Sequence, residues 1–121
     1  MQHQHSYLQY LEMSQKNKWH RSLFGSDSVC EKILGLIAIK SEADKPLTIS
    51  AIMQFQDLGS PGTIHRRLEV LRRAGLIEQV FKNSDRRTKY LVPTEVAASY
   101  FKTMDDVIEL VALNSHEKVL T

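Results

Sequence analysis

The stretch LGSPGTIHRRLEVLRRAGLI, residues 58–77, predicts a helix whose start and end are both marked in the sequence. Ser60 can cap the first turn, and Pro61 suits the first helical position because its missing N–H needs no partner there. Gly75 is expected to end the helix, since glycine readily adopts the left-handed conformation that follows a helix C-terminus. The preceding glycine, Gly59, breaks the chain before the cap in the same way.

The two faces of this helix differ in chemistry. At 100° per residue, Ile64, Leu68 and Leu71 fall on one side and predict the buried face. The opposite side and its flanks hold Gly62, Thr63, His65, Arg66, Glu69, Arg72 and Arg73. Taken alone, such a face is also typical of a solvated helix surface with i,i+3 and i,i+4 ion pairs.

Further helices are predicted before this stretch. Residues 6–20 form the first, and its apolar side comprises Tyr7, Leu8, Leu11 and Trp19. A second helix begins at a cap provided by Ser26 or Asp27 and ends before Pro46, which disfavours helix at the residue preceding it. Its apolar residues recur at helical spacing as Val29, Ile33, Leu36 and Ile37. A short third helix is expected to follow Thr48 as its cap.

After the helix of residues 61–74, the sequence predicts a β-hairpin and a closing helix. Residues 76–82 and 88–93 form the strands, joined by the turn-forming NSDRR. The closing helix begins at Thr94 and Glu95 and extends to about Asn114. Its apolar stripe comprises Val96 or Ala97, Tyr100, Phe101, Met104, Val107, Ile108 and Val111. This order predicts a winged helix-turn-helix, a mainly α fold with a small β-hairpin.

The bulk composition is typical of a soluble globular protein. A length of 121 residues favours one domain, with a winged-helix core at 26–93 between an N-terminal helix or arm, 1–25, and a C-terminal helix, 94–121. No apolar run approaches the roughly 20 residues that cross a bilayer, so no membrane partner is expected. The single cysteine, Cys30, cannot form an internal disulfide, which favours a reducing compartment, the cytoplasm.

Positive charge is concentrated in one quarter of the chain. The net charge is +2, yet residues 61–90 contain eight Lys or Arg against three Asp or Glu, a net of +5, and the remainder carries −3. A basic face of this kind is expected where a protein meets a polyanion. In a helix-turn-helix, the N-terminal half of the second helix reaches base edges, which favours Thr63, His65 and Arg66 as base contacts. Gly62 would let the backbone approach the duplex closely.

The hairpin is the second expected contact with DNA. Arg86 and Arg87, placed at its tip by the predicted turn, would enter the minor groove or grip its walls. Lys82 and Lys89 would lie against phosphates, and Asp85 would shape the turn and orient the arginine. Alternatively, these residues have no binding role and simply form a solvated hairpin tip, since loops are usually polar. The charge segregation favours the DNA interpretation.

Residues 47–95 resemble the DNA-binding region of MarR-type winged-helix transcriptional regulators. The motifs that carry the resemblance are LGSPGTIHRRLEVLRRAGLI, similar to the recognition helix and exit strand, and DRRTKYLVPT, similar to the wing. The resemblance implies that Pro61, Gly62, Thr63, His65 and Arg66 lie in the major groove, and that Asp85 and Arg86 form a wing pair with Arg87 adjoining. Ser60, Arg73, Lys82 and Lys89 complete the expected DNA-binding set.

The resemblance also implies a homodimer whose N- and C-terminal helices interlock and hold two recognition helices on a near-palindromic operator. The residues expected at this interface are Tyr7, Leu8, Leu11, Tyr100, Phe101, Met104, Val107, Ile108 and Val111. The region after the hairpin is short for that family. The sequence gives no indication of a small-molecule effector.

The leading interpretation is therefore a dimeric, sequence-specific DNA-binding regulator, in particular a repressor that covers promoter DNA. Two alternatives stay open: a winged helix that binds other proteins, and a DNA-binding protein of a replication or mobile-element system. No catalytic motif and no cofactor are expected. No metal site is expected either, because the HQH of His3 and His5 lacks a cysteine or carboxylate cluster at ligand spacing. Oxidation sensing by Cys30 is disfavoured, because nothing near it in sequence would lower its pKa.

Overall fold

The structure is a computed structural model that describes residues 5–17, 20 and 27–120, with side chains described as far as Asn114. The chain divides into two compact units. One is Asp27–Ala98, and the other combines Met1–Ser26 with Ser99–Thr121.

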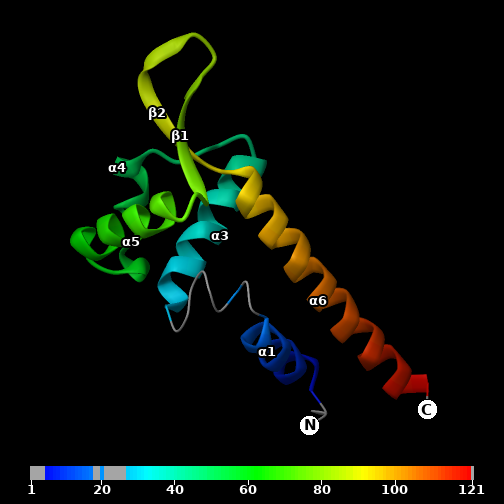
Figure 1. The fold of residues 1–121 in the computed structure, drawn as a ribbon. Coiled ribbons are helices and arrows are strands. Elements are labelled where there is room, and N and C mark those ends of the chain that lie inside the picture. Colours follow the sequence, from blue (N-terminus) through cyan, green and yellow to red (C-terminus); the bar gives the residue numbers. More distant parts are fainter. Residues whose placement is uncertain (1–4, 18–19, 21–26, 121) are drawn as a thin grey trace. The chain divides into compact units, whose positions relative to one another are not determined.

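The unit Asp27–Ala98 contains the helices α3 (Ser28–Glu42), α4 (Ile49–Ile52) and α5 (Pro61–Arg73), with a 3₁₀ turn, η1 (Gln56–Leu58), between the last two. An antiparallel hairpin follows, made of β1 (Ile77–Lys82) and β2 (Asp85–Pro93). Figure 1 shows the hairpin projecting away from these helices. Helix α6 (Glu95–Leu120) starts in this unit and continues into the other. The predicted class, mainly α with a small β-hairpin, is confirmed for the described part of the chain.

Side-chain caps define where these helices begin, as the sequence predicts. Asp27 Oδ1 accepts hydrogen bonds from the N–H groups of Val29 and Cys30, both at 3.1 Å, whereas the alternative cap, Ser26, lies outside the described residues. Thr48 Oγ1 accepts from the Ala51 N–H at 3.1 Å. Because each cap satisfies an N–H that has no partner within the helix, it fixes the first turn.

Helix α5 has the predicted boundaries. Ser60 caps it, Pro61 occupies its first position, and Gly75 follows its last turn with φ of +75°. Thr94 connects this end of α5 to the start of α6: its hydroxyl donates to the Gly75 carbonyl and accepts from the Ala97 N–H at 3.3 Å.

The core of this unit is formed by the apolar faces of α3 and α5 together with the base of the hairpin. Ile64, Leu68 and Leu71 are buried, which confirms the predicted inner face of α5. The other buried apolar residues of the unit are Cys30, Ile33, Leu34, Ile37, Leu47, Ile52, Leu76, Ile77, Leu91 and Ala97. The Leu91 N–H donates to the Leu47 carbonyl at 2.7 Å, so the segment before α4 is bound to the outer edge of β2.

The hairpin turn is shorter than predicted. Strand β2 begins at Asp85 rather than at residue 88, and only Asn83 and Ser84 lie between the strands. Asn83 has φ of +57°, a conformation that asparagine tolerates, so two residues suffice to reverse the chain. The ladder pairs Phe81 with Lys89 and then Lys82 with Asp85. Residues 86–88 therefore form a bulge without partners in β1, and Arg86 and Arg87 lie in this bulge rather than in the turn.

The other unit contains α1 (Ser6–Lys16) and the part of α6 from Ser99 onward. Helix α1 is shorter than the predicted 6–20, because Asn17 is extended (φ −67°, ψ 119°). The Asn17 side chain also accepts the His20 N–H at 3.0 Å, a local bond that competes with continuing the helix. Helix α6 is longer than predicted and continues past Asn114 to Leu120, through a segment without glycine or proline.

The apolar residues of this unit are only partly buried. On α1 the buried side chains are Gln9 and Ser14, whereas Tyr7 is 68% exposed, Leu8 is exposed and Leu11 is half-buried. The predicted apolar side of α1 is therefore not a buried face in the single chain, and Trp19 lies outside the described residues. On α6, Tyr100, Met104 and Val111 are buried, Phe101 and Val107 are half-buried, and Val96 and Ile108 are exposed.

Candidate functional site

The N-terminal half of α5 presents polar groups to solvent. Pro61, Gly62, His65 and Arg66 are all exposed there, and Gly62 and Arg66 lie on the side of the helix away from Ile64. Within the described residues, Arg66 has no ion-pair partner, and the one carboxylate on the same helix, Glu69, pairs with Arg72 and Arg73. An exposed guanidinium with its five donors free can bind a planar acceptor such as a guanine edge or a phosphate.

Thr63 is less free than the sequence suggests. The Ser60 hydroxyl donates to Thr63 Oγ1 at 3.1 Å, and the Ser60 oxygen accepts the Thr63 N–H at 3.3 Å. The Thr63 methyl group also faces Gly59, where a Cβ would lie 3.1 Å from it and where φ is +120°. Ser60 and Thr63 therefore primarily fix the start of α5, and Gly59 is required by its backbone conformation.

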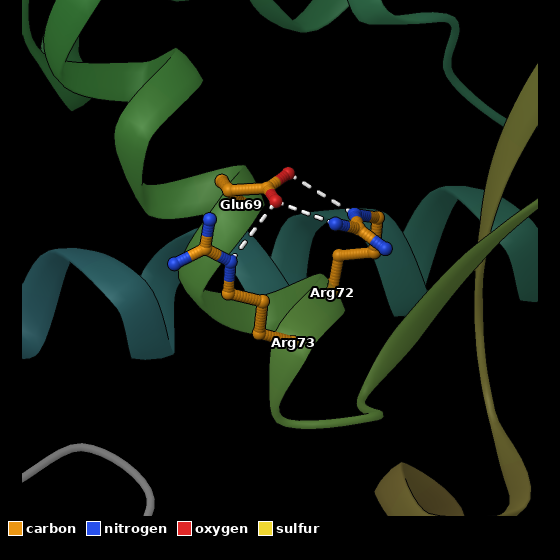
Figure 2. Close-up of polar contacts among 3 residues, drawn as sticks. All are labelled: Glu69, Arg72 and Arg73. Carbon is orange, nitrogen blue, oxygen red and sulfur yellow. Dashed lines mark hydrogen bonds and ion pairs between the residues drawn. The ribbon is translucent and has the colours of Figure 1, made fainter.

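A cluster formed by Glu69, Arg72 and Arg73 occupies the C-terminal half of α5 (Figure 2). The Arg72 Nε donates to Glu69 Oε2 at 3.0 Å, and its Nη2 donates to Oε1, so Arg72 binds the carboxylate with two nitrogens. The Arg73 Nε donates to the same Oε1 at 3.1 Å. Arg73, an expected DNA contact, and its neighbour Arg72 are thus both held along the helix surface by one acid.

This cluster also perturbs the carboxyl group. Hydrogen bonding from Arg72, reinforced by its charge and by Arg73, lowers the pKa of Glu69 to about 2. The reciprocal hydrogen bond and charge of Glu69 raise the pKa of Arg72. Arg73, one of the predicted DNA contacts, is still 77% exposed in this arrangement, so it can meet a ligand. Exposed pairs of this kind contribute little to stability and can exchange partners.

The four cations of the hairpin are held in different ways. Lys82 Nζ lies 3.4 Å from Asp44 Oδ1, which draws it toward the end of α3 rather than leaving it free for phosphate. Asp85 accepts the Arg87 N–H at 2.9 Å and lies 3.6 Å from Arg87 Nε. These contacts lie in the bulge rather than in the turn, and the arginine that Asp85 orients is Arg87 rather than the predicted Arg86.

Arg86 and Lys89 contact an aromatic ring instead of an acid. The Arg86 Cζ lies 5.4 Å from the centroid of the Phe81 ring, and the Lys89 Nζ lies 5.8 Å from it. Sequence reasoning missed Phe81. A signal was present, since an aromatic residue in a strand with cations around the following turn can bind their charges over its face.

Arg67 has a structural role. Its Nε lies 3.0 Å from Asp27 Oδ2, which joins α5 to the start of α3. Burial raises the pKa of the Asp27 carboxyl. The Cys30 N–H and Arg67 together lower this pKa by more than burial raises it, so the net pKa is below the usual value of 3.8. Cys30 is 2% exposed, and burial together with the nearby Asp27 charge raises the pKa of its thiol to about 11. Such a thiol is poorly reactive, in agreement with the disfavoured role as an oxidation sensor.

A cavity of about 70 Å³ lies between α5 and the base of the hairpin. It is lined by both apolar and polar residues, namely Ile49, His65, Leu68, Glu69, Arg72, Ile77, Glu78, Gln79 and Leu91. The cavity is far smaller than the roughly 300–1,000 Å³ of typical ligand sites. His65 lines it together with Glu69 and Arg72 of the cluster.

Across residues 5–17, 20 and 27–120, no three His, Cys, Asp or Glu side chains come together as a metal site. No helix in these ranges has the length and apolar character required to span a bilayer. Comparisons with protein-family models, curated proteins and solved structures found no significant match to the chain.

Proposed function

We propose that this protein is a sequence-specific double-stranded DNA-binding transcription regulator. In this proposal the unit Asp27–Ala98 is a winged helix-turn-helix, with α5 as the recognition helix in the major groove and the β1–β2 hairpin as the wing. The observation that carries the proposal is the exposed, unpaired Arg66 near the start of α5, on the same unit as the two hairpin cations Arg86 and Lys89, which also lack a carboxylate partner among the described residues.

The basic residues differ in their partners within the protein, and we assign them different contacts with DNA accordingly. Arg66 is the candidate for reading bases, because an arginine can donate two hydrogen bonds to guanine. Arg86 and Lys89 are candidates for phosphate or minor-groove contact. Arg73 and Arg87 can join them by exchanging an exposed carboxylate for a phosphate, whereas Lys82 is drawn toward Asp44.

We also propose that the protein acts as a homodimer. The exposed apolar side chains of α1 and α6 support this proposal, and they comprise Tyr7, Leu8, Ile108, Leu110 and Leu113. Leu110 and Leu113 were not among the predicted interface residues. Burial of such side chains against a second copy removes apolar surface from water, at about 25 cal/mol per Å². A dimer that covers promoter DNA would act as a repressor in the cytoplasm, without enzymatic activity.

The decisive experiment is fluorescence anisotropy of labelled duplexes at two salt concentrations. Promoter DNA, including the region upstream of the protein's own gene, is compared with scrambled DNA of the same length. We expect tighter binding to a promoter and a steep loss of affinity with salt, because bound phosphates release counterions. Absence of binding at low salt would overturn the proposal and favour a protein-docking role for the hairpin.

Two arginine variants separate base reading from phosphate binding. Arg66→Ala is expected to reduce discrimination between promoter and scrambled DNA by about 1–3 kcal/mol. Arg86→Ala is expected to weaken binding to all duplexes and to reduce the salt dependence. Lys102→Ala, which removes an exposed cation from α6, is the charge-matched control and should change neither property. Equal losses on all sequences for both arginine variants would remove Arg66 from base reading.

A further inference from the structure

The exposed aromatic ring in the hairpin, Phe81, has no role in the core. Its side chain is 38% exposed, and it belongs to the last regular pair of the ladder, opposite Lys89. We propose that Phe81 is a positioning residue that holds the cationic groups of Arg86 and Lys89 ready for phosphate. This inference rests on the proposed DNA-binding function and names a residue through which that function would act.

The cationic groups of Arg86 and Lys89 both lie over the Phe81 ring. Arg86 Cζ and Lys89 Nζ lie 5.4 Å and 5.8 Å from the centroid of the Phe81 ring. Both distances are within the roughly 6 Å over which the negative face of an aromatic ring attracts a cation. One ring therefore holds two positive groups from the opposite strand.

The backbone around Arg86 is irregular. Residues 86–88 have no partners in β1, so the ladder does not fix the segment that carries Arg86. The neighbouring Arg87 is held by Asp85, whose carboxylate accepts its N–H and pairs with its side chain. Within the described part of the hairpin, the Arg86 side chain contacts the Phe81 ring. The ring thus provides at Arg86 the constraint that Asp85 provides at Arg87.

The two constraints differ in their electrostatic effect. A carboxylate neutralises the arginine that it holds and competes with phosphate for the same donors. An aromatic ring orders the cation but carries no net charge, so Arg86 and Lys89 keep their full attraction for a polyanion. Because ordering a long side chain on binding lowers affinity, a cation that is already held should bind more tightly.

The test compares Phe81→Leu with Phe81→Tyr in the full-length chain. Leucine preserves an apolar side chain but removes the ring, whereas tyrosine preserves the ring. We expect Phe81→Leu to weaken binding to promoter and scrambled duplexes alike, by about two- to fivefold. Phe81→Tyr should bind as the wild type does. Neither change alters the net charge, so any difference does not come from long-range attraction.

A double-mutant cycle distinguishes positioning from direct contact of the ring with DNA. In a variant that already carries Arg86→Ala and Lys89→Ala, Phe81→Leu should have no further effect on affinity, because the groups that it positions are gone. If Phe81→Leu lowers the affinity by the same factor in that variant, the inference is overturned, because the ring then contacts DNA directly. Circular dichroism of each variant checks folding, and Phe81→Met replaces Phe81→Leu if the latter is unfolded.

The outcomes also separate this inference from the proposed function. If wild-type protein binds no duplex at low salt, the DNA-binding proposal itself fails and the role of Phe81 fails with it. If the wild type binds and Arg86→Ala weakens binding but Phe81→Leu does not, only the positioning role is overturned. If Phe81→Leu loses DNA affinity and Phe81→Tyr retains it, the result supports both the DNA-binding function and the positioning role of Phe81.

Discussion

Arg67 and Asp27 form an ion pair across 40 positions of the chain, with 3.0 Å between Nε and Oδ2. The same carboxylate caps α3 through Oδ1. One acidic side chain therefore both starts α3 and attaches α5 to it. Because α5 bears the candidate site, a residue outside that site helps to hold it in place.

Asp27→Ala is expected to lower the free energy of unfolding by about 1–2 kcal/mol, mostly through the lost cap. Arg67→Ala, which leaves the cap intact, should cost less, about 0.2–1 kcal/mol, because the pair is partly exposed to solvent. Urea denaturation of the three proteins measures both changes. An equal loss in the two variants would mean that the ion pair, rather than the cap, dominates.

The Asp27 carboxyl also predicts a dependence of stability on pH. Its pKa is lowered in the folded protein, so its stabilising contribution is complete above the unfolded value near 3.8 and is lost as pH falls through the lower folded value. Asp27→Asn keeps a capping oxygen but does not titrate. Stability measured between about pH 5 and pH 2 should therefore fall less steeply in this variant. Parallel curves would exclude a contribution from Asp27.

Glu69→Gln should release Arg72 and Arg73 from their shared acid. We expect tighter binding to scrambled DNA and a salt dependence steeper by about one to two phosphate contacts, with a smaller preference for promoter DNA. Glu78→Gln is the matched control, since Glu78 is an exposed acid on β1 without an ion pair in the described part of the chain. Anisotropy titrations measure all three proteins. Equal gains in both variants would indicate a general effect of charge instead.

The Cys30 thiol is expected to react slowly with alkylating reagents in the folded protein. A pKa raised from 9.0 to about 11 reduces the thiolate fraction on the order of a hundredfold near neutral pH, and burial slows access further. Mass spectrometry of native and urea-denatured protein, treated with iodoacetamide, checks this. Rapid modification of the native protein would restore Cys30 as a candidate sensor.

The proposed dimer should weaken when a charge is placed on the exposed apolar face of α6. Ile108, which is 52% exposed, is the first choice, and Ile108→Glu should shift the protein toward monomer. Lys102→Glu, at an exposed polar position of the same helix, is the control and should leave the assembly unchanged. Sedimentation velocity measures both. A wild-type protein that is monomeric at micromolar concentration would contradict the dimer proposal.

Local signals in the sequence were sufficient for the elements that position the site. Ser60, Pro61 and Gly75 mark the ends of α5 because caps and left-handed turns depend on neighbouring residues alone. The buried face of Ile64, Leu68 and Leu71 follows from helical spacing. The long-range partners could not be predicted in this way. Lys82 meets Asp44 and Arg67 meets Asp27 only because the fold brings distant segments together.

The predicted ends of α1 and of the hairpin turn were wrong because local side-chain and backbone interactions compete there with the regular element. The Asn17 side chain accepts the His20 N–H, and the chain leaves α1 after Lys16 instead of continuing to residue 20. Asn83 adopts a left-handed conformation, so a two-residue turn replaces the five residues of NSDRR. In both places an asparagine offers the backbone an alternative that periodicity does not reveal.

The bulge at residues 86–88 has a consequence for solubility. An exposed strand with free N–H and C=O groups can pair with a strand of another molecule and begin aggregation. Near the tip of the hairpin, the break in the ladder and the charges of Arg86 and Arg87 make β2 a poor template for such pairing. At its base, Leu47 occupies a position beside Leu91. The irregular backbone that displays the arginines thereby also hinders edge-to-edge association through β2.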